Sequence, residues 1–321
     1  MTLRNQVLSL LEQSQGTVLS GQELADTLYV SRTAIWKAIQ QLRQQGYTIE
    51  ASSNKGYWLA TSSDTLSADA VSSYLAKEGF VLPVEYHETL ASTNDRAKQL
   101  AFEGAVHGTV VIANAQSAGR GRYGRSFFSP AHTGLYLSLV LRPTTPIDAA
   151  AHITMSSAVS VCQAIAPWSK QEPQIKWIND IYLGERKLGG ILSEAQFGLE
   201  SGSLDSAVVG IGLNVATAEH EFPTELQHKA VSLFPDKIRR SQLAANIVIS
   251  VLRNLDQPFH TLLPEYRQRS LLLGRDIVFT LGGRTLEGTA QEVNDEGHLI
   301  VLSNISTIAL HSGEVSIKEF K

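Results

Sequence analysis

The 321-residue sequence predicts an α+β protein built from three parts that differ in their patterning. In the first part, apolar residues recur at helical spacing and lead into a short alternating segment. In the second part, segments of strand and helix character alternate up to about residue 273. From Gly274 onward, short strands are interrupted by glycine-rich turns, which is typical of an SH3-like small β-barrel. We therefore expect domains over residues 1–62, 66–273 and 274–321.

The first part has the element order of a winged helix-turn-helix. Its first helix is expected to end at Gly16, and Ser20–Glu23 is a capping box in which serine and glutamate each bond a free backbone N–H. A third helix is expected to begin at Ser31. Residues 48–59 then alternate like a hairpin that turns at residues 54–56.

The central part is predicted to be a mixed α/β domain that follows a small, polar linker at residues 60–65. Strands are expected at residues 84–88, 109–113, 135–141, 175–183 and 208–215. Helices are expected at residues 94–102, 153–166 and 241–255. No internal repeat is evident.

Composition excludes several classes of protein. The hydrophobic share of 43% is ordinary, and no apolar run reaches the roughly 18 residues of a membrane span. The N-terminus lacks a signal-peptide layout, so we expect a cytoplasmic protein with no membrane partner. Cys162 is the one cysteine and lies in an apolar segment, which excludes an internal disulfide and favours a buried thiol. The net charge of −4 gives no overall sign of nucleic-acid binding.

The strongest candidate for chemistry is the segment Gly119–Arg125, GRGRYGR. Its glycines satisfy the G-x-G-x-x-G pattern, but SFFSP follows instead of a helix, so a dinucleotide fingerprint is not supported. The segment is not a Walker A loop either, and a flexible surface loop is the simple alternative. Because Arg120, Arg122 and Arg125 place three guanidinium groups in seven residues, we favour a loop that closes over carboxylate and phosphate groups.

Two further segments have both a structural and a functional interpretation. Ser92–Asn94 follows an expected strand and precedes a helix, so these residues either cap the helix or face a ligand. Gly210 and Gly212 interrupt an apolar strand at a spacing of two and therefore face the same side. They mark either a tight core contact or the close approach of a ligand.

Lysine residues occur in two expected strands. Lys176 begins the segment KWIND and Lys187 begins KLGG, with a turn between them. A lysine in an apolar strand is costly to bury unless it is paired. The two segments therefore form either a sheet edge with solvated lysines or part of a charged site. Asn179 and Asp180 are, accordingly, either turn residues or members of that site.

In chain order, these segments resemble the motifs of the biotin–protein ligases, in the bifunctional form that is also the biotin operon repressor. The matching segments are Ser92–Asn94, Gln116, Gly119–Arg125, Ser129–Pro130, Lys176–Asp180, Lys187–Gly190 and Gly210–Asn214. The resemblance covers the whole chain. It implies an ATP-dependent ligase that forms biotinyl-5'-AMP from biotin and ATP. Such a ligase then transfers biotin to a lysine of an acceptor protein, a biotin carboxyl-carrier domain.

The resemblance also implies roles for individual residues. Lys187 and Arg122 would be catalytic, with Lys187 holding the biotin carboxylate as it attacks the α-phosphate of ATP. The implied biotin-binding residues are Ser92, Thr93, Asn94, Gln116, Gly119, Arg120, Gly121, Arg122, Lys187, Gly210 and Gly212. The implied ATP-binding residues are Arg122, Arg125, Phe127, Lys176, Asn179, Asp180 and Asn214. Asp180 is also expected to orient either Mg²⁺ or a lysine of the site.

For the first part, the resemblance implies binding of operator DNA and a homodimer that forms when biotinyl-AMP is bound. The implied DNA-binding residues are Ser31, Arg32, Thr33, Lys37 and Lys55. The helix that begins at Ser31 carries only basic charges, which suits phosphate and base-edge contacts. A winged helix used only for protein contacts is the alternative.

Two positions depart from the family pattern, and two other functions stay open. Ile178 stands where proline is usual, so the strand is expected to bend differently, and Phe127 stands where tryptophan is usual, which reduces the aromatic surface for adenine. A lipoate-type ligase would use a related scaffold, but lipoate lacks the ureido ring that Ser92, Thr93 and Gln116 suit. A biotin-sensing repressor without ligase activity would not need Lys187 or the loop arginines.

Overall fold

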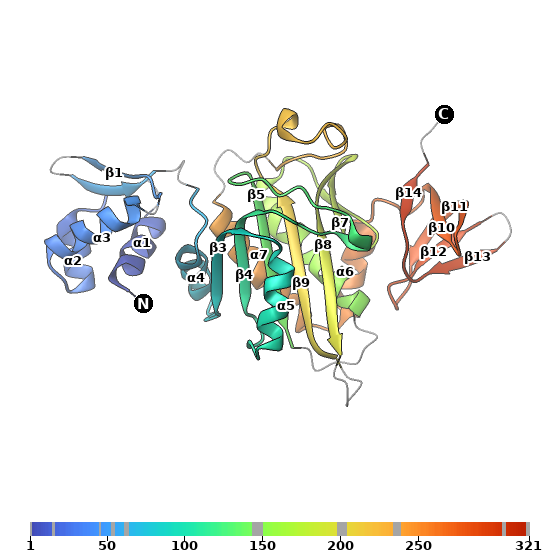
Figure 1. Cartoon of the computed structure of the whole chain (residues 1–321), viewed down its shortest axis with the longest axis horizontal. Coiled ribbons are helices and arrows are strands. Elements are labelled where there is room, and N and C mark those ends of the chain that lie inside the picture. Colours follow the sequence, from blue (N-terminus) through green and yellow to red (C-terminus); the bar gives the residue numbers. More distant parts are fainter. Residues whose placement is uncertain are drawn as a thin grey trace. The chain divides into compact units, whose positions relative to one another are not determined.

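The computed structural model describes residues 2–14, 17–44, 46–52, 55–60, 64–142, 150–197, 204–233, 239–303 and 306–318 (Figure 1). Contacts divide the chain into two compact units, residues 1–86 with 235–246 and residues 87–234 with 247–321. The expected helix end at Gly16, the turn residue Asn54 and linker residues 61–63 lie outside the described residues. The domain boundaries near residues 62–66 and 273 stay a prediction.

The winged helix-turn-helix expected for the first part is confirmed. It consists of α1 (Leu3–Gln13), α2 (Gly21–Leu28), α3 (Arg32–Gln44), β1 (Ile49–Ser52) and β2 (Gly56–Leu59), with β1 and β2 antiparallel. The capping box also forms: Ser20 Oγ accepts from the Glu23 N–H, and Glu23 Oε2 accepts from the Ser20 N–H. Side chains of all three helices and of the hairpin share one buried core, which includes Val7, Leu24 and Ile35.

A helix that the sequence pattern did not reveal, α4 (Ala68–Lys77), packs against α1. Arg4 forms a 2.8 Å ion pair with Asp69 of α4, and the Tyr47 hydroxyl lies 2.6 Å from Ser67 Oγ. Asp64, at the described end of the expected linker, accepts hydrogen bonds from the Arg240 backbone N–H at 2.7 Å and from its guanidinium at 2.6 Å. Polar bonds thus hold the winged helix within its own unit.

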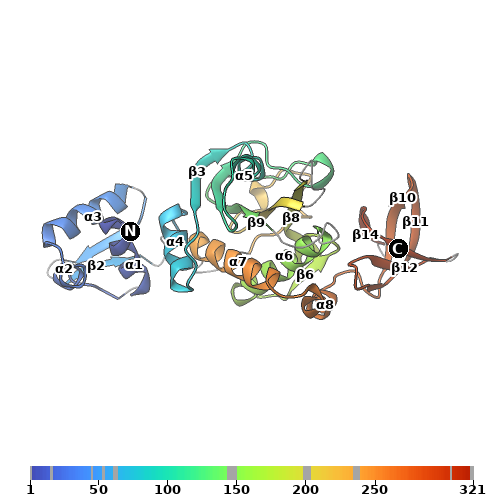
Figure 2. The same ribbon diagram turned by 90° about the horizontal axis from the view of Figure 1, so that it is seen from below.

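The central part folds around a seven-stranded sheet with the order β3-β4-β5-β9-β8-β7-β6. Its strands are β3 (Val84–Leu90), β4 (Val110–Gln116), β5 (Gly134–Leu141), β6 (Pro173–Lys176), β7 (Asp180–Leu183), β8 (Arg186–Phe197) and β9 (Leu204–Asn214). Figure 2 shows α5 (Thr93–Phe102) on one face and α6 (Ala150–Ile165) on the other. Because both faces are covered, every residue of β5 is buried.

Two further helices, α7 (Arg240–Leu255) and α8 (Phe259–Gln268), complete this part, and α8 contacts α6. Cys162 of α6 is fully buried, as its apolar neighbours predict, and burial raises the pKa of its thiol to about 12. A thiol with so high a pKa is a structural group. No helix in the described parts of the chain is long and apolar enough to cross a membrane.

The single strand predicted at residues 175–183 is wrong. The segment forms two antiparallel strands, β6 and β7, which reverse direction at Trp177–Asn179. Bonds from distant parts of the chain hold this turn: the Trp177 indole N–H donates to Gly297 O at 3.0 Å, and the Tyr266 hydroxyl donates to Ile178 O at 3.2 Å. Ile178 therefore lies in a turn and does not bend a strand, and its peptide bond to Trp177 is cis.

The last part is an antiparallel β domain, in agreement with the pattern of short strands. Its strands are β10 (Asp276–Leu281), β11 (Arg284–Val293), β12 (Leu299–Leu302), β13 (Thr307–Leu310) and β14 (Val315–Ile317). They pair in the order β13-β12-β11-β10-β14. Gly282 and Gly283 both have positive φ angles and form the tight turn between β10 and β11.

A buried carboxyl group gives the first unit a testable dependence on pH. Glu12 of α1 is 3% exposed, and burial raises its pKa from 4.5 to about 7, although Arg239 and Lys77 oppose the shift. Between these two pH values the folded chain keeps a proton that the unfolded chain has lost, so stability falls as pH rises through this window. Above pH 7 the Glu12 carboxylate is charged in both states, and its burial lowers the free energy of unfolding by the full amount.

We predict that Glu12→Gln raises the free energy of unfolding at pH 8 by on the order of 2–3 kcal/mol. At pH 4, where the carboxyl is largely neutral in both states, the variant and the parent protein should differ little. Urea unfolding at pH 4, 6 and 8 measures this, with Glu50→Gln on exposed β1 as the control. Equal stability of Glu12→Gln and the parent protein at pH 8 would contradict the prediction.

Candidate active site

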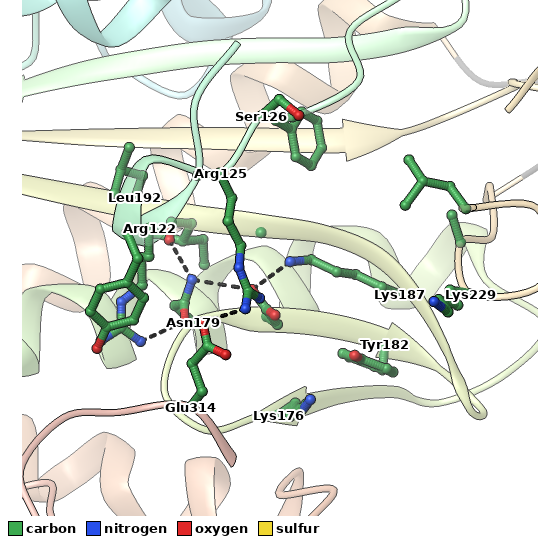
Figure 3. Close-up of a pocket in the computed structure, with 18 of the residues that line it drawn as sticks. Arg122, Arg125, Ser126, Lys176, Asn179, Tyr182, Lys187, Leu192, Lys229 and Glu314 are labelled. Carbon is green, nitrogen blue, oxygen red and sulfur yellow. Dashed lines mark hydrogen bonds and ion pairs between the residues drawn. The ribbon is translucent and has the colours of Figure 1, made fainter. Parts of the chain in front are cut away.

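A cavity of about 400 Å³ opens on the second unit, where β6, β7, β8, the Gly119–Arg125 loop and the segment before β14 converge (Figure 3). Its lining is strongly basic. Among the residues that the structure describes, six cationic side chains line it, against two carboxylates. The cations are Arg120, Arg122, Arg125, Lys176, Lys187 and Lys229, and the carboxylates are Asp180 and Glu314. Such a cavity has the size of a small-molecule site and the charge to hold an anion.

The Gly119–Arg125 loop is held by its own backbone and by its arginines. Gly121 N–H donates to Arg125 O at 2.7 Å, and a single 3-10 turn spans Arg122–Gly124. The Arg122 guanidinium donates to Asn179 Oδ1 at 3.1 Å. Arg120 is paired with Asp95 of α5, and Arg125 with Glu314. The simple interpretation as a loose surface loop is therefore not supported.

Lys187 and Asp180 form the central ion pair of the cavity. Lys187 Nζ lies 2.8 Å from Asp180 Oδ1, and Lys187 keeps 37% of its side chain exposed (Figure 3). Asn179 Nδ2 donates to the same Asp180 oxygen at 3.1 Å and to Ile191 O at 2.8 Å. A Cβ at Gly190 would lie 3.1 Å from Asp180 Oδ1, so a side chain there would crowd the pair. The lysine is thus placed with its amine accessible from the cavity.

Lys176 lies close to the same charges but is more deeply enclosed. Burial lowers the pKa of its amine, the Asp180 carboxylate partly opposes this shift, and Lys187 adds to it. Its Nζ lies 5.8 Å from the centre of the Tyr182 ring, an aromatic neighbour. An incoming anion would favour the charged form of Lys176 by supplying the negative charge that the cavity lacks.

A buried polar network lies beside the cavity without lining it. Gln116 Oε1 accepts from the Thr93 N–H at 2.9 Å, Ser138 Oγ donates to Asn94 Oδ1 at 2.6 Å, and the Ser138 and Thr93 hydroxyl oxygens lie 2.8 Å apart. Gln116 Nε2 donates to Ser129 Oγ at 3.0 Å. Ser92 caps α5, as its structural interpretation predicts. These polar groups now form hydrogen bonds to one another. The network therefore contains both donors and acceptors that a ligand could use.

The two glycines of β9 do face the same side, and side chains occupy the space above both. A Cβ at Gly210 would collide with the Asn94 amide, and a Cβ at Gly212 would lie 2.6 Å from the Phe127 ring. Phe127 itself packs edge-on against Tyr136, with ring centres 6.4 Å apart. The tight-contact interpretation therefore describes this conformation, and a ligand would have to replace one of these side chains.

The predicted site residues thus separate into two groups. Those that line the cavity are Arg120, Gly121, Arg122, Arg125, Phe127, Lys176, Asn179, Asp180, Lys187 and Asn214. Those that do not are Ser92, Thr93, Asn94, Gln116, Gly119, Gly210 and Gly212. Sequence reasoning missed Lys229, Tyr182 and Glu314 of the lining. Lys229 and Glu314 lie in irregular segments without a motif, so only their position in space reveals them.

Metal ligands are sparse in this site. In the parts of the chain that the structure describes, no group of three or more His, Cys, Asp or Glu side chains could hold a metal ion. Asp180, expected to orient either Mg²⁺ or a site lysine, is paired with Lys187.

The implied DNA-binding residues lie at the start of α3 and in the hairpin of the first unit. Ser31 caps α3 by accepting from the Ala34 N–H at 3.2 Å. Arg32, Thr33 and Lys37 are exposed on α3, and Lys55 is exposed between β1 and β2. Two aromatic side chains that the sequence did not single out are also exposed there, Tyr29 at 95% and Trp36 at 52%. Trp36 follows buried Ile35, so it points away from the core.

Three family models match the chain in the order of its parts. They are an HTH domain over residues 3–58, the biotin/lipoate A/B protein ligase family over residues 86–214, and the biotin protein ligase C terminal domain over residues 272–318. A bifunctional ligase/repressor of Bacillus subtilis is 35% identical over 98% of this chain and 99% of its own length. The chain belongs to the bifunctional ligase/repressor family. The fold class and the resemblance predicted from the sequence are thereby confirmed.

Other relatives agree with this family membership. The bifunctional ligase/repressor of Escherichia coli K12 is 28% identical over 95% of this chain and 94% of its own length. A solved structure, the biotin protein ligase of Aquifex aeolicus in complex with biotin and ATP, superposes with a TM-score of 0.63 at 26% identity. The superposition covers 74% of this chain and 99% of that one.

The contact between Gly212 and Phe127 gives a prediction for this member of the ligase/repressor family. We expect Gly212→Ala to force the Phe127 ring aside, at a cost of about 1–3 kcal/mol in the free energy of unfolding. In a Phe127→Ala background the same change should cost at least about 0.5 kcal/mol less. Urea unfolding of the four chains in this double-mutant cycle measures the difference.

Gly121→Ala is the matched control, since a Cβ there meets no atom closer than 3.6 Å. The assigned contact is wrong if Gly212→Ala costs the same with and without the Phe127 ring.

Proposed function

We propose that the protein joins biotin to ATP to form biotinyl-5'-AMP, transfers biotin to a lysine of a biotin carboxyl-carrier domain, and represses transcription in response to biotin. The observation that carries the ligase half is the cavity in which five cations surround an accessible lysine–aspartate pair, in a chain of this family. Both substrates of the first step are anions, so the excess of positive charge suits their joint binding.

The phosphates of ATP would take the place of the protein carboxylates that now hold the cations. Arg125 is paired with Glu314, and Lys187 with Asp180, and both partners lie at the cavity wall. Arg122, Lys176 and Lys229 are the further cations for the triphosphate. The adenine would contact Asn179 and Asn214, with Phe127 as the aromatic surface. Charge-assisted bonds from guanidinium groups to phosphate are short and strong, which favours this exchange of partners.

Biotin would be recognised through hydrogen bonds to the buried polar network beside the cavity. Its ureido ring offers one strong acceptor and two donors, and Ser92, Thr93, Asn94 and Gln116 carry the complementary groups. Because these groups are now bonded to one another, the ring would enter by exchanging those bonds. Movement of Asn94 and Phe127 would free the space above Gly210 and Gly212. Gly119, Arg120 and Gly121 would then close over the carboxylate end.

The chemistry consists of two displacements. A carboxylate oxygen of biotin attacks the α-phosphorus of ATP, a new P–O bond forms, and the bond to pyrophosphate breaks. The acceptor lysine, as a free amine, then attacks the acyl carbon, and AMP leaves with the bonding electron pair. Lys187 would orient the carboxylate, and Arg122 would stabilise the charge that gathers on the phosphoryl oxygens. A closed loop would also keep water from the reactive anhydride.

Mg²⁺ is the remaining component of the proposal, and the donor set fits it. Magnesium usually keeps water and phosphate ligands and takes one or two carboxylates from the protein. Asp180 would be that carboxylate, provided that its pair with Lys187 loosens when ATP binds. The ion would neutralise part of the triphosphate charge.

Lys187→Ala should lower biotin-dependent exchange of labelled pyrophosphate into ATP by about 10²-fold or more, because it removes a charge-assisted contact to the reacting carboxylate. Lys170→Ala, an exposed lysine outside the cavity, is the control and should leave the exchange unchanged. Normal exchange by the Lys187→Ala protein would show that this lysine has another role. Lipoate in place of biotin tests the lipoate-type alternative, and it should support no exchange.

The repressor half rests on the exposed basic start of α3. One winged helix with few basic residues should bind DNA weakly, whereas two held in a homodimer gain from their effective concentration and match a two-fold symmetric site. Closure of the Gly119–Arg125 loop over biotinyl-AMP would complete the dimer surface. The intermediate would then favour the form that binds DNA. The acceptor protein would compete for the same surface, so ligation and repression would exclude each other.

Biotin with ATP should increase both dimerisation, measured by sedimentation, and binding to a symmetric duplex selected from a random-sequence pool, measured by gel shift. Arg32→Ala together with Lys37→Ala should weaken DNA binding by about tenfold or more and leave pyrophosphate exchange intact. If biotin with ATP changes neither dimerisation nor DNA binding, the regulatory half fails while the ligase half stands.

A further inference from the structure

Two histidines meet at the open end of a hairpin in the last part of the chain. His298 precedes β12 and His311 follows β13, and the last paired residues of these strands are Leu299 and Leu310. The two imidazoles are therefore the next cross-strand pair. His298 Nε2 lies 2.9 Å from His311 Nδ1, and the ring centres lie 3.9 Å apart at an interplanar angle of 57°.

The separation of the ring centres distinguishes two interpretations of this contact. A straight N–H···N hydrogen bond between two imidazoles keeps the ring centres about 5 Å apart, since each nitrogen lies about 1 Å from its own ring centre. The observed 3.9 Å is shorter, so the rings lie side by side with their nitrogen edges together. Loss of the proton shared by the two rings, with a small outward turn of each ring, would let both nitrogen lone pairs face a common point.

The distance between the two nitrogens fits a metal ion at that point. Two nitrogens bound at about 2.1 Å and at right angles to each other lie about 2.9–3.0 Å apart, with their ring centres about 4.5 Å apart, so the rings would open from the observed 3.9 Å on binding. Imidazole is a ligand that nickel, copper and zinc prefer, and right angles are typical of square-planar and octahedral ions. We propose that His298 and His311 bind a divalent transition-metal ion of the nickel and copper class, with water in the remaining positions.

The backbone around the pair holds the ligands in place before any ion arrives. The His298 N–H donates to Asn294 Oδ1 at 2.8 Å, and the Asn294 N–H donates to His298 O at 3.0 Å. Leu299 and Leu310 beneath the pair are buried, which fixes the two strands. His311 is exposed, so an ion can reach the site from solvent. Because only two protein ligands are supplied, the affinity should be micromolar rather than nanomolar.

Calorimetric titration of the untagged full-length protein with NiCl₂ tests the proposal. One ion should bind per chain with a dissociation constant in the micromolar range. His298→Ala and His311→Ala should each weaken binding by about tenfold or more. Nickel at saturation should also raise the midpoint of thermal unfolding of the parent protein but not of the double variant.

His260→Ala is the matched control, since this histidine is exposed on α8 and lies outside the pair. It should bind nickel as the parent protein does. Circular dichroism of each variant establishes that it is folded. Binding that requires millimolar nickel, or that persists unchanged in the double variant, would overturn the proposal. The test does not depend on ligase activity, so its failure and that of the proposed function are distinguishable.

Discussion

The mutual repulsion of six cations in one cavity is the constraint on which the site depends. Like charges brought into a partly enclosed space destabilise the fold unless each is paired or loses its proton. For four of the six, the chain supplies protein acceptors: Asp180 for Lys187, Asp95 for Arg120, Glu314 for Arg125 and the Asn179 amide for Arg122. In the proposed function, an anionic ligand would replace partners that already exist, and its binding would be an exchange of ion pairs.

These acceptors come from three separate segments of the chain, so the fold is what makes the site possible. Asp95 lies on α5, Asp180 begins β7, and Glu314 precedes β14 in the C-terminal β domain. The Trp177–Gly297 hydrogen bond ties the turn between β6 and β7 to that same domain. The C-terminal β domain therefore supplies both a wall of the cavity and a support for its central hairpin.

Local signals in the sequence predicted the elements that local bonds determine. The capping box at Ser20–Glu23 and the shared face of Gly210 and Gly212 follow from spacing alone, and both are present. The hairpin at residues 173–183 could not be predicted, because the bonds that fix its turn come from Tyr266 and Gly297. Sequence motifs also named five of the six cations of the described cavity lining. They could not identify Glu314 or Lys229, which reach the cavity only through the tertiary fold.

The two glycines of β9 bear on how the protein could be altered to accept acids of another shape. The sheet leaves two hollows at Gly210 and Gly212, and Asn94 and Phe127 fill them from a helix and a loop that are separate from the sheet. Replacing Asn94 or Phe127 would alter the shape of the hollow but leave every hydrogen bond between strands intact. If biotin binds over these glycines as proposed, the scaffold and the selectivity for the acid would be encoded by different residues. A laboratory selection for enlarged or altered acids would therefore do best to randomise positions 94 and 127 and to keep both glycines fixed.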